Sequence, residues 1–258
     1  MSTTEPLPKT HAAVTGDGTA LERYQDVVVG RRSWRGLLYF EFCSWMSGLP
    51  GALGLLMRKT FWPRLLGACG RKVYFGRNVT LMHPGRIRIG DHTVIGDGCV
   101  LDARNPTRET VLEIGAAVML SHGVVLSCKN GSITIGDRCG FGPYSVIQSA
   151  HDNAVTIGDD VIGGSHCFVT GSGNYNTDRL DVPISKQGTQ KTGGTRIGDG
   201  VWLGARASAV GGVSIGRGAI VGTGAVVTRP LPERSVSVGM PARVIRTRGA
   251  DDQPGTDP

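Results

Sequence analysis

The sequence predicts an all-β solenoid, in which short strands wind into a stack of similar coils with a triangular cross-section. Two observations carry this prediction: a composition rich in glycine and an internal repeat that occupies most of the chain. Among the 258 residues 40 are glycine, and 40% are hydrophobic, 6% aromatic and 19% charged. This composition excludes a charge-rich disordered chain. Collagen is excluded as well, because the glycines follow no three-residue period.

The repeat is marked by the triplet Ile-Gly-(Asp/Ala/Arg), which begins six successive units. The triplets begin at Ile89, Ile114, Ile135, Ile157, Ile197 and Ile215. Their spacings of 25, 21, 22, 40 and 18 residues correspond to one unit of 18 residues with insertions. Within the units a six-residue period appears: sixteen of its eighteen first positions are large and apolar, and thirteen of the fifth positions are small or β-branched. A period of six is neither helical nor that of an ordinary strand, so it predicts a short strand and a tight turn, three times per coil.

Stacked coils of this kind form a parallel β-helix, in which each coil buries the face of its neighbour. Glycine and aspartate at the second and third positions supply the turn backbone. Cys99, Cys139 and Cys167 occupy the small fifth position, so they are expected to be core residues rather than reactive thiols. The six cysteines form no CxxC pair, which excludes a zinc ribbon or a thioredoxin-like site. Because the chain opens on a polar segment and not on a secretory leader, reduced thiols in a cytoplasmic protein are expected.

The C-terminal repeats contain the most specific motifs. They read IGDGVWLGA at residues 197–205, VGTGAVVTR at 221–229 and GMPARVIR at 239–246, and DVPISKQG at 181–188 interrupts the preceding coil. This block resembles the hexapeptide-repeat family of left-handed β-helix acyltransferases, and within it the sugar and polysaccharide O-acetyltransferases. The resemblance extends over about residues 71–248.

The resemblance implies a left-handed β-helix that uses acetyl-CoA as co-substrate and a sugar or glycan hydroxyl as acceptor. It also implies a homotrimer with active sites between neighbouring chains. By resemblance, the acetyl-CoA cleft is lined by Trp202, Gly204, Ala205, Gly222 and Thr223, and Arg229 and Arg243 face the CoA phosphates. The alternative is that the tryptophan and the glycines serve coil packing alone and that the two arginines are solvated.

The catalytic base is the point where the sequence departs from the family. Family members carry a histidine about eight residues before the Pro-Ile of the loop, and it takes the proton of the substrate hydroxyl. Here that position is Tyr175, between Asn174 and Asn176. A phenol with a pKa of about 10 needs strong tuning to act as a base. The two asparagines are candidates for positioning and oxyanion contacts.

Two histidines are alternative candidates for the base. His151 stands beside Asp152 in the coil before the loop, and His166 lies one strand ahead of the loop. A zinc site of the type that β-helix carbonic anhydrases carry needs a close histidine pair. His122, His151 and His166 are 29 and 15 residues apart, so no metal is expected. A chain that kept the scaffold and lost acyl transfer is a further alternative.

The N-terminal segment has a different composition from the repeat. Residues 21–72 hold nine Lys/Arg against three acidic residues, which accounts for +6 of the net charge of +7. This uneven distribution excludes a uniformly basic nucleic-acid binder. Seven of the 15 aromatic residues fall within residues 34–62, and Pro50 interrupts the apolar stretch, so we expect two helices of about a dozen residues. They cap the first coil, make peripheral membrane contact through residues 31–72 at the inner face of the membrane, or do both with opposite faces.

These observations predict four segments: a disordered N-terminus (1–20), a basic, aromatic helical segment (21–72), the β-helix domain (73–248) with a loop at 174–195, and a disordered acidic tail (249–258). The predicted function is transfer of an acetyl group from acetyl-CoA to a sugar hydroxyl, in surface polysaccharide or glycolipid biosynthesis. The alternatives are N-acetylation of an amino sugar and a non-catalytic scaffold or assembly protein.

Overall fold

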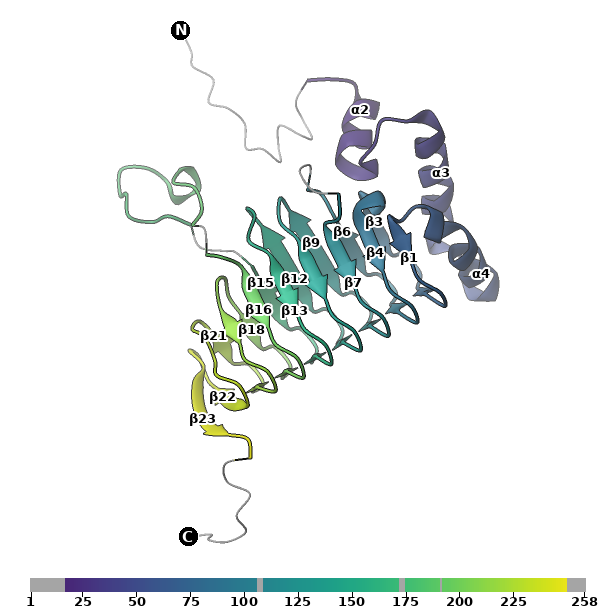
Figure 1. Ribbon diagram of the computed structural model, residues 1–258. Coiled ribbons are helices and arrows are strands. Elements are labelled where there is room, and N and C mark those ends of the chain that lie inside the picture. The colour runs from purple at the N-terminus through teal and green to yellow at the C-terminus, as the bar shows by residue number, and fades with distance from the viewer. Residues whose placement is uncertain (1–16, 106–108, 172–174, 191, 250–258) are drawn as a thin grey trace.

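The computed structural model describes residues 17–105, 109–171, 175–190 and 192–249. It is a β-solenoid of about seven turns with a few N-terminal helices, consistent with a left-handed β-helix (Figure 1). Each turn contributes one strand to each of three sheets, and neighbouring strands in the stack are parallel. The predicted fold class is confirmed.

Each sheet runs along the whole stack. The first sheet contains β1 (Ala68–Cys69), β4 (Ile87–Ile89), β7 (Leu112–Ile114), β10 (Ile133–Ile135), β13 (Val155–Ile157), β16 (Thr195–Ile197) and β19 (Ser214–Ile215). The second contains β2 (Tyr74–Phe75), β5 (Val94–Ile95), β8 (Met119–Leu120), β11 (Gly140–Phe141), β14 (Ile162–Gly163), β17 (Trp202–Leu203), β20 (Ile220–Val221), β22 (Ser235–Val238) and β23 (Arg243–Thr247). The third contains β3 (Thr80–Met82), β6 (Val100–Asp102), β9 (Val125–Lys129), β12 (Val146–Ala150), β15 (Phe168–Thr170), β18 (Ser208–Ala209) and β21 (Val226–Val227).

The large hexad positions point into the prism, as predicted. Ile95 and Leu101 are fully buried, and Ile114 pairs in register with Ile135 of the next coil. Gly163 is an exception to the pattern of large residues, and the structure explains it. A Cβ on Gly163 would lie 2.7 Å from Cδ1 of Phe141, so the large ring of the preceding coil fills the space.

The aspartate of the triplet links successive coils. Asp159 Oδ1 accepts a hydrogen bond from the Asp137 N–H at 2.9 Å, and Asp199 Oδ1 accepts one from the Asp159 N–H at 3.0 Å. These carboxylates satisfy turn N–H groups that the strand ladders leave unpaired. The three cysteines assigned to the core, Cys99, Cys139 and Cys167, are buried, and burial raises the pKa of each thiol to about 11.

Helices cover the first coil of the solenoid (Figure 1). They are α2 (Ala20–Tyr24), η1 (Gln25–Val29), α3 (Trp34–Trp45), η2 (Met46–Gly48), α4 (Gly51–Phe61) and η3 (Trp62–Arg64). The two predicted helices correspond to α3, with 12 residues, and α4, with 11. Two elements were not predicted from the sequence: α2, whose Thr19 forms a capping box with Glu22, and the π-helical η1 that continues it.

This N-terminal cap packs directly on β2. The rings of Trp62 and Phe75 lie 5.3 Å apart, and the Trp62 Nε1–H donates to Cys43 O at 3.1 Å. The buried Arg58 guanidinium donates to Phe75 O at 3.0 Å and to Leu49 O at 2.8 Å. The helices therefore close the open end of the stack, as the predicted helical cap requires.

The strands extend slightly beyond the predicted β-helix boundary. The first strand begins at Ala68 rather than at residue 73, because β1 pairs with β4 although it lacks a large apolar first position. At the other end β22 and β23 form an antiparallel pair, which the six-residue period did not predict. Residues 1–16 and 250–258, which include most of the two predicted disordered termini, lie outside the described residues. Within the described ranges, no helix is long and apolar enough to cross a membrane.

Candidate active site

Turns run along all three edges of the prism, and the candidate residues lie at two of these edges. We call the turns that join the second sheet to the third the second corner; they include residues 122–123, 143–144, 165–166, 205–206 and 223–224. We call the connections from the third sheet to the first sheet of the next coil the third corner. The third corner includes residues 151–154 and the loop between β15 and β16, which projects from the stack (Figure 1).

The predicted acetyl-CoA residues gather at the second corner of the last coils. Trp202 lies in β17 with a half-exposed side chain, and Ala205 and Thr223 occupy the turns that follow β17 and β20. Gly204 has a packing role, since a Cβ there would lie 2.6 Å from the Thr223 backbone nitrogen. Gly222 is similarly constrained, because its Cβ would meet Val238 Cγ1 at 2.8 Å.

His166 lies in the same corner row, one coil before Ala205. The two turns are joined by a hydrogen bond of 2.8 Å from the Arg206 N–H to Ser165 O. The imidazole of His166 stacks on the ring of Tyr144 at 5.4 Å, and Tyr144 meets His122 edge-on at 5.0 Å. The second corner therefore carries a ladder of three rings, one per coil, that leads toward the predicted acetyl-CoA residues.

The contacts of Tyr144 with His122 and His166 were not predicted, although the hexad register indicates that Tyr144 and His166 stack. Tyr144 follows the hexad position Phe141 by three residues, as His166 follows Gly163. Residues at equal hexad positions stack above one another in neighbouring coils. Counting from the hexad start therefore predicts that these two side chains meet.

His151 and Asp152 lie at a different prism edge, the third corner. Both are exposed, and their turn stands at the base of the projecting loop. The neighbouring Asn153 is buried, and its Oδ1 accepts hydrogen bonds from the N–H groups of Thr192 at 3.1 Å and Gly193 at 3.2 Å. The structure thus separates the two histidine candidates: His166 adjoins the acetyl-CoA residues and His151 adjoins the loop.

The projecting loop is held by its own side chains. Tyr175 is half-exposed and forms a bridge with Thr189. The side-chain amide of Asn176 donates to Gln187 O at 2.9 Å, and the Gln187 Nε2 donates to Val182 O at 3.0 Å. The Asn176 amide is thus engaged inside the loop, next to η5 (Ile184–Lys186). Asn174, the other predicted loop contact, lies outside the described residues.

The predicted phosphate ligands flank the last strand of the third sheet. Arg229 follows β21 by two residues, and Arg243 begins β23 directly after Ala242, whose N–H donates to Val226 O at 2.8 Å. Both arginine side chains are exposed. A second group of basic side chains was not predicted from the sequence. It surrounds a hollow of about 640 Å³ lined by Arg217, Arg234, Arg246 and Arg248, with Glu233 among them.

The described part of the chain shows no candidate metal site. Among its residues, no group of three or more His, Cys, Asp and Glu side chains could hold a metal ion. The histidines considered for zinc are divided between two corners, since His122 and His166 lie in the second corner row and His151 in the third.

Residues 194–229 match the family model described as bacterial transferase hexapeptide (six repeats). This segment contains β16 to β21 and with them Trp202, Ala205 and Thr223. The match shows that residues 194–229 carry hexapeptide repeats of this type, and the structure continues the same coil architecture on the N-terminal side of that segment.

Two curated relatives have names that specify acetyl transfer. The probable acetyltransferase Rv3034c of Mycobacterium tuberculosis is 34% identical over 137 residues, which are 53% of this chain and 44% of that protein. The serine acetyltransferase of Salmonella typhimurium is 42% identical over 71 residues, 26% of each protein. The chain thus spans less than half the length of these two relatives.

The solved structures with a similar fold include two mutants of AntD, an N-acyltransferase from Bacillus cereus, each in complex with dTDP and coenzyme A. One has a TM-score of 0.51 at 19% identity and covers 73% of this chain and 88% of the AntD chain. The other has a TM-score of 0.50 at 21% identity, with coverage of 71% and 85%. At this level of identity the likeness establishes the fold.

Proposed function

We propose that this chain is a CoA-dependent acyltransferase that moves an acetyl group from acetyl-CoA to a sugar hydroxyl, in surface polysaccharide or glycolipid biosynthesis. The observation that carries the proposal is the composition of the second corner. There the turn that holds His166 is hydrogen-bonded to the turn that holds Ala205. Ala205 lies within the segment that matches the bacterial transferase repeat, and His166 lies in the coil before it. The acetyltransferase names of two relatives support the same reaction class.

Acetyl-CoA would lie along the second corner, against the side chains of Trp202, Ala205 and Thr223. The exposed Arg229 and Arg243 flank the C-terminal end of this row and would face the phosphates. Guanidinium groups suit that role, because they form paired, charge-assisted hydrogen bonds with phosphate oxygens. Gly204 and Gly222 would contribute by keeping the coils close together.

His166 is the base that this arrangement favours. In the reaction the acceptor oxygen attacks the thioester carbonyl carbon while the imidazole takes the hydroxyl proton. The tetrahedral intermediate then collapses, its carbon–sulfur bond breaks, and CoA leaves as a thiolate that takes up a proton. Tyr175 and His151 remain the alternative bases, and both belong to the loop side of the chain. A loop from a neighbouring chain would bring Tyr175 and Asn176 to this corner.

The second sheet supplies a surface for the homotrimer that such a site requires. Its outward row carries the exposed side chains Tyr74, Met119, Ile162 and Trp202, which are 40–59% accessible. An apolar row of this length on a flat sheet is typical of a protein interface. Three chains related by rotation would cover the row and place each loop near a neighbour's second corner.

The N-terminal cap would bring the enzyme to the cytoplasmic face of a membrane. Trp34, Leu38 and Trp45 share one face of α3, and each is at least 66% exposed. The exposed Arg35 and Lys59 lie on the same cap. Exposed tryptophan and leucine beside cationic side chains are typical of interfacial helices that lie on anionic lipid. A lipid-linked glycan would then meet the site as acceptor.

Isothermal titration of the purified chain with acetyl-CoA tests the proposal. We expect saturable binding at about one site per chain, competition by free CoA, and release of CoA thiol when a sugar acceptor is added. A Thr223→Trp variant should lose binding, because the indole would fill the second corner. The matched control is Thr134→Trp, at an exposed position on the first sheet. Transfer to an amino group alone would identify an N-acetyltransferase, and a folded chain that binds neither ligand would be a scaffold protein.

A further inference from the structure

The cap leaves a cavity of about 360 Å³ against the first coil, on the side of the third sheet. This volume lies within the range of roughly 300–1,000 Å³ that is usual for ligand pockets. Its apolar wall is formed by Val28, Phe40, Trp62, Leu65, Val79 and Leu81. The wall therefore combines η1, α3 and η3 of the cap with the chain that enters β3.

The polar groups deep in this wall are already paired with one another or with the backbone. The Tyr24 hydroxyl donates to Glu41 Oε1 at 2.6 Å, and the Ser47 hydroxyl donates to Val79 O at 3.1 Å. The Trp62 Nε1–H is held by Cys43 O. Ser44 lines the same cavity and is exposed, so it lies at the rim. The interior consequently suits a hydrocarbon chain, whose transfer out of water is favourable without any hydrogen bond.

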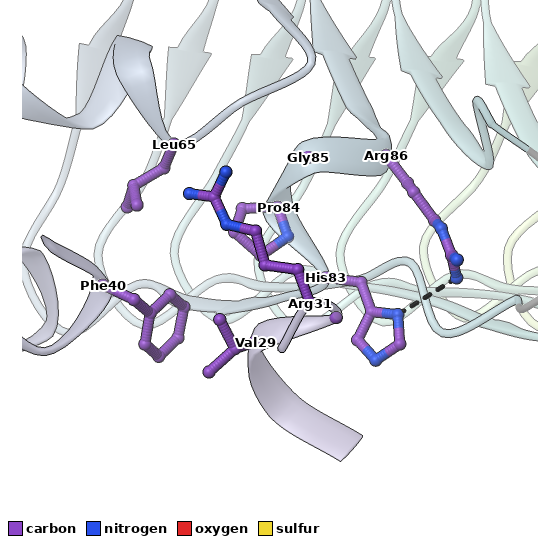
Figure 2. A pocket seen from close by; sticks show the side chains of 9 residues that line it. Val29, Arg31, Phe40, Leu65, His83, Pro84, Gly85 and Arg86 are labelled. Atoms are coloured by element: carbon purple, nitrogen blue, oxygen red, sulfur yellow. Dashed lines mark hydrogen bonds between the residues drawn. The ribbon is translucent and has the colours of Figure 1, made fainter. Parts of the chain in front are cut away.

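A small basic hollow adjoins the cavity, and Figure 2 shows the residues that line it. Phe40 and Leu65 line both spaces, so the two are neighbours. The hollow itself has about 50 Å³ of room and is lined by Arg31, His83 and Arg86. Neither arginine forms an ion pair with a carboxylate in the described ranges of the chain. Two cationic groups with no ion-pair partner among the described residues therefore line the hollow beside the apolar cavity.

The hydrogen-bond partners of His83 fit a neutral imidazole, so the positive charge of the hollow comes from Arg31 and Arg86. The His83 Nε2 lies 2.8 Å from Asp26 O, which only accepts, so this nitrogen carries the hydrogen. Its Nδ1 then accepts from Arg86 Nη1 at 3.2 Å (Figure 2). The same guanidinium also donates to Asn105 O, which fixes it at the edge of the hollow.

We propose that the N-terminal cap binds one molecule of an anionic membrane lipid, with a hydrocarbon chain in the cavity and the phosphate at Arg31 and Arg86. An apolar chain and a phosphate group match the two adjoining spaces in polarity and in charge. The outward face of α3 carries Trp34, Leu38 and Trp45, which provide the membrane contact from which a lipid would enter. This site lies outside the second corner, so it does not depend on the proposed acyl transfer.

Titration calorimetry of the full chain with dodecyl phosphate, below its micelle concentration, tests the proposal. We expect one saturable site per chain, no measurable binding of inorganic phosphate, and weaker binding of the neutral dodecyl maltoside. Arg31→Gln should weaken dodecyl phosphate about tenfold or more, the usual effect of losing one charge-assisted contact. It should leave dodecyl maltoside unchanged. The matched control is Arg88→Gln, an exposed arginine of β4 whose Nε donates to Thr110 Oγ1.

Two variants probe the hydrocarbon part of the site. Val28→Trp should fill the cavity and abolish binding of both amphiphiles, whereas Val125→Trp on the outward side of the distant β9 should not. If Val28→Trp does not fold, Ser44→Trp at the exposed rim blocks entry without entering the core. Undiminished dodecyl phosphate binding in the folded cavity variant would overturn the proposal. So would equal affinities for dodecyl phosphate and inorganic phosphate. Acetyl-CoA titration of the same samples reports separately on the acyltransferase site.

Discussion

A Cβ atom on Gly136 would lie 2.3 Å from Oδ1 of Asp159 in the next coil. That same oxygen accepts the hydrogen bond from the Asp137 N–H. The glycine and the aspartate of the repeated triplet are therefore one structural unit. Glycine leaves room for a carboxylate from the following coil, and the carboxylate satisfies the N–H of the residue after the glycine.

Gly136→Ala should destabilise the solenoid because the added methyl displaces the Asp159 carboxylate. Overpacking of this kind costs about 1–3 kcal/mol in folding free energy. Gly140→Ala is the matched control, since a Cβ at that position meets open space. Urea unfolding followed by circular dichroism measures both variants. Equal midpoints for the two alanine variants would show that the contact with Asp159 has no energetic importance.

The buried Arg58 should be essential for the attachment of the cap. Replacement by methionine keeps the apolar stem but leaves the carbonyls of Phe75 and Leu49 without their donor. An unsatisfied buried polar group costs about 1–3 kcal/mol, so we expect a loss of at least about 2 kcal/mol. Thermal unfolding measures the effect, and Arg88→Met on the exposed face of β4 is the control. A stable Arg58→Met variant would mean that water replaces the guanidinium.

The regular part of the fold could be predicted because its physics is local and periodic. Ile95 and Leu101 are successive first positions of the hexad register, so one register predicts that both side chains are buried. The antiparallel pair β22–β23 could not be found in this way, because it begins where the period of six ends. The cap likewise depends on long-range contacts, such as the one between Arg58 and Phe75, that no short window of sequence contains.

Part of the candidate site could be predicted because its residues follow the periodic register of the repeat. Ala205 and Thr223 hold the same hexad position, so the sequence places them in one row, and Trp202 precedes Ala205 by three residues. The separation of His151 from His166 depends on which corner each turn occupies, and only the complete coil shows that. Asn176 donates its amide to Gln187 O across the loop, and no periodic pattern predicts a contact within an irregular segment.

The stability of the cap should decrease in mild acid because of His83. Burial lowers the pKa of this imidazole below 6.5, while the unfolded chain binds a proton at that pH. The contribution of the neutral, buried His83 imidazole to the free energy of unfolding is therefore present above pH 6.5. It is lost as the pH falls toward the lower pKa of the folded state. His83→Asn should remove this part of the pH dependence, since asparagine tolerates the left-handed backbone at φ 52°.

Melting temperatures between pH 7.5 and 5.5 test this prediction. The difference between the wild type and His83→Asn should shrink as the pH falls. His151→Asn is a matched control, because His151 has a similar φ of 53° but an exposed side chain. A constant difference for His83→Asn over the whole range would contradict the role assigned to burial.

Removal of the proposed base should affect turnover far more than acetyl-CoA binding. His166→Asn should lower kcat by about 10²- to 10⁴-fold, the usual contribution of a general base. Asparagine suits the left-handed backbone of that turn, and His92→Asn, at an exposed position with φ 59°, provides the matched control. Acetyl-CoA affinity from calorimetry should change little in either variant. A large loss of turnover in Tyr175→Phe, with His166→Asn active, would assign the base to the loop.

Membrane contact should depend on the outward face of α3. In flotation with vesicles of phosphatidylcholine and phosphatidylglycerol, the wild type should rise with the lipid. Trp34→Ser combined with Trp45→Ser should lower the partition coefficient by about tenfold or more, because each indole removes a large apolar area from water. Leu180→Ser is the control, at a fully exposed apolar position on the projecting loop. Salt should weaken the wild-type interaction, since basic side chains attract the anionic surface over about 10 Å at 0.1 M ionic strength. Wild-type protein that stays in the soluble fraction at low salt would contradict the membrane role of these tryptophans.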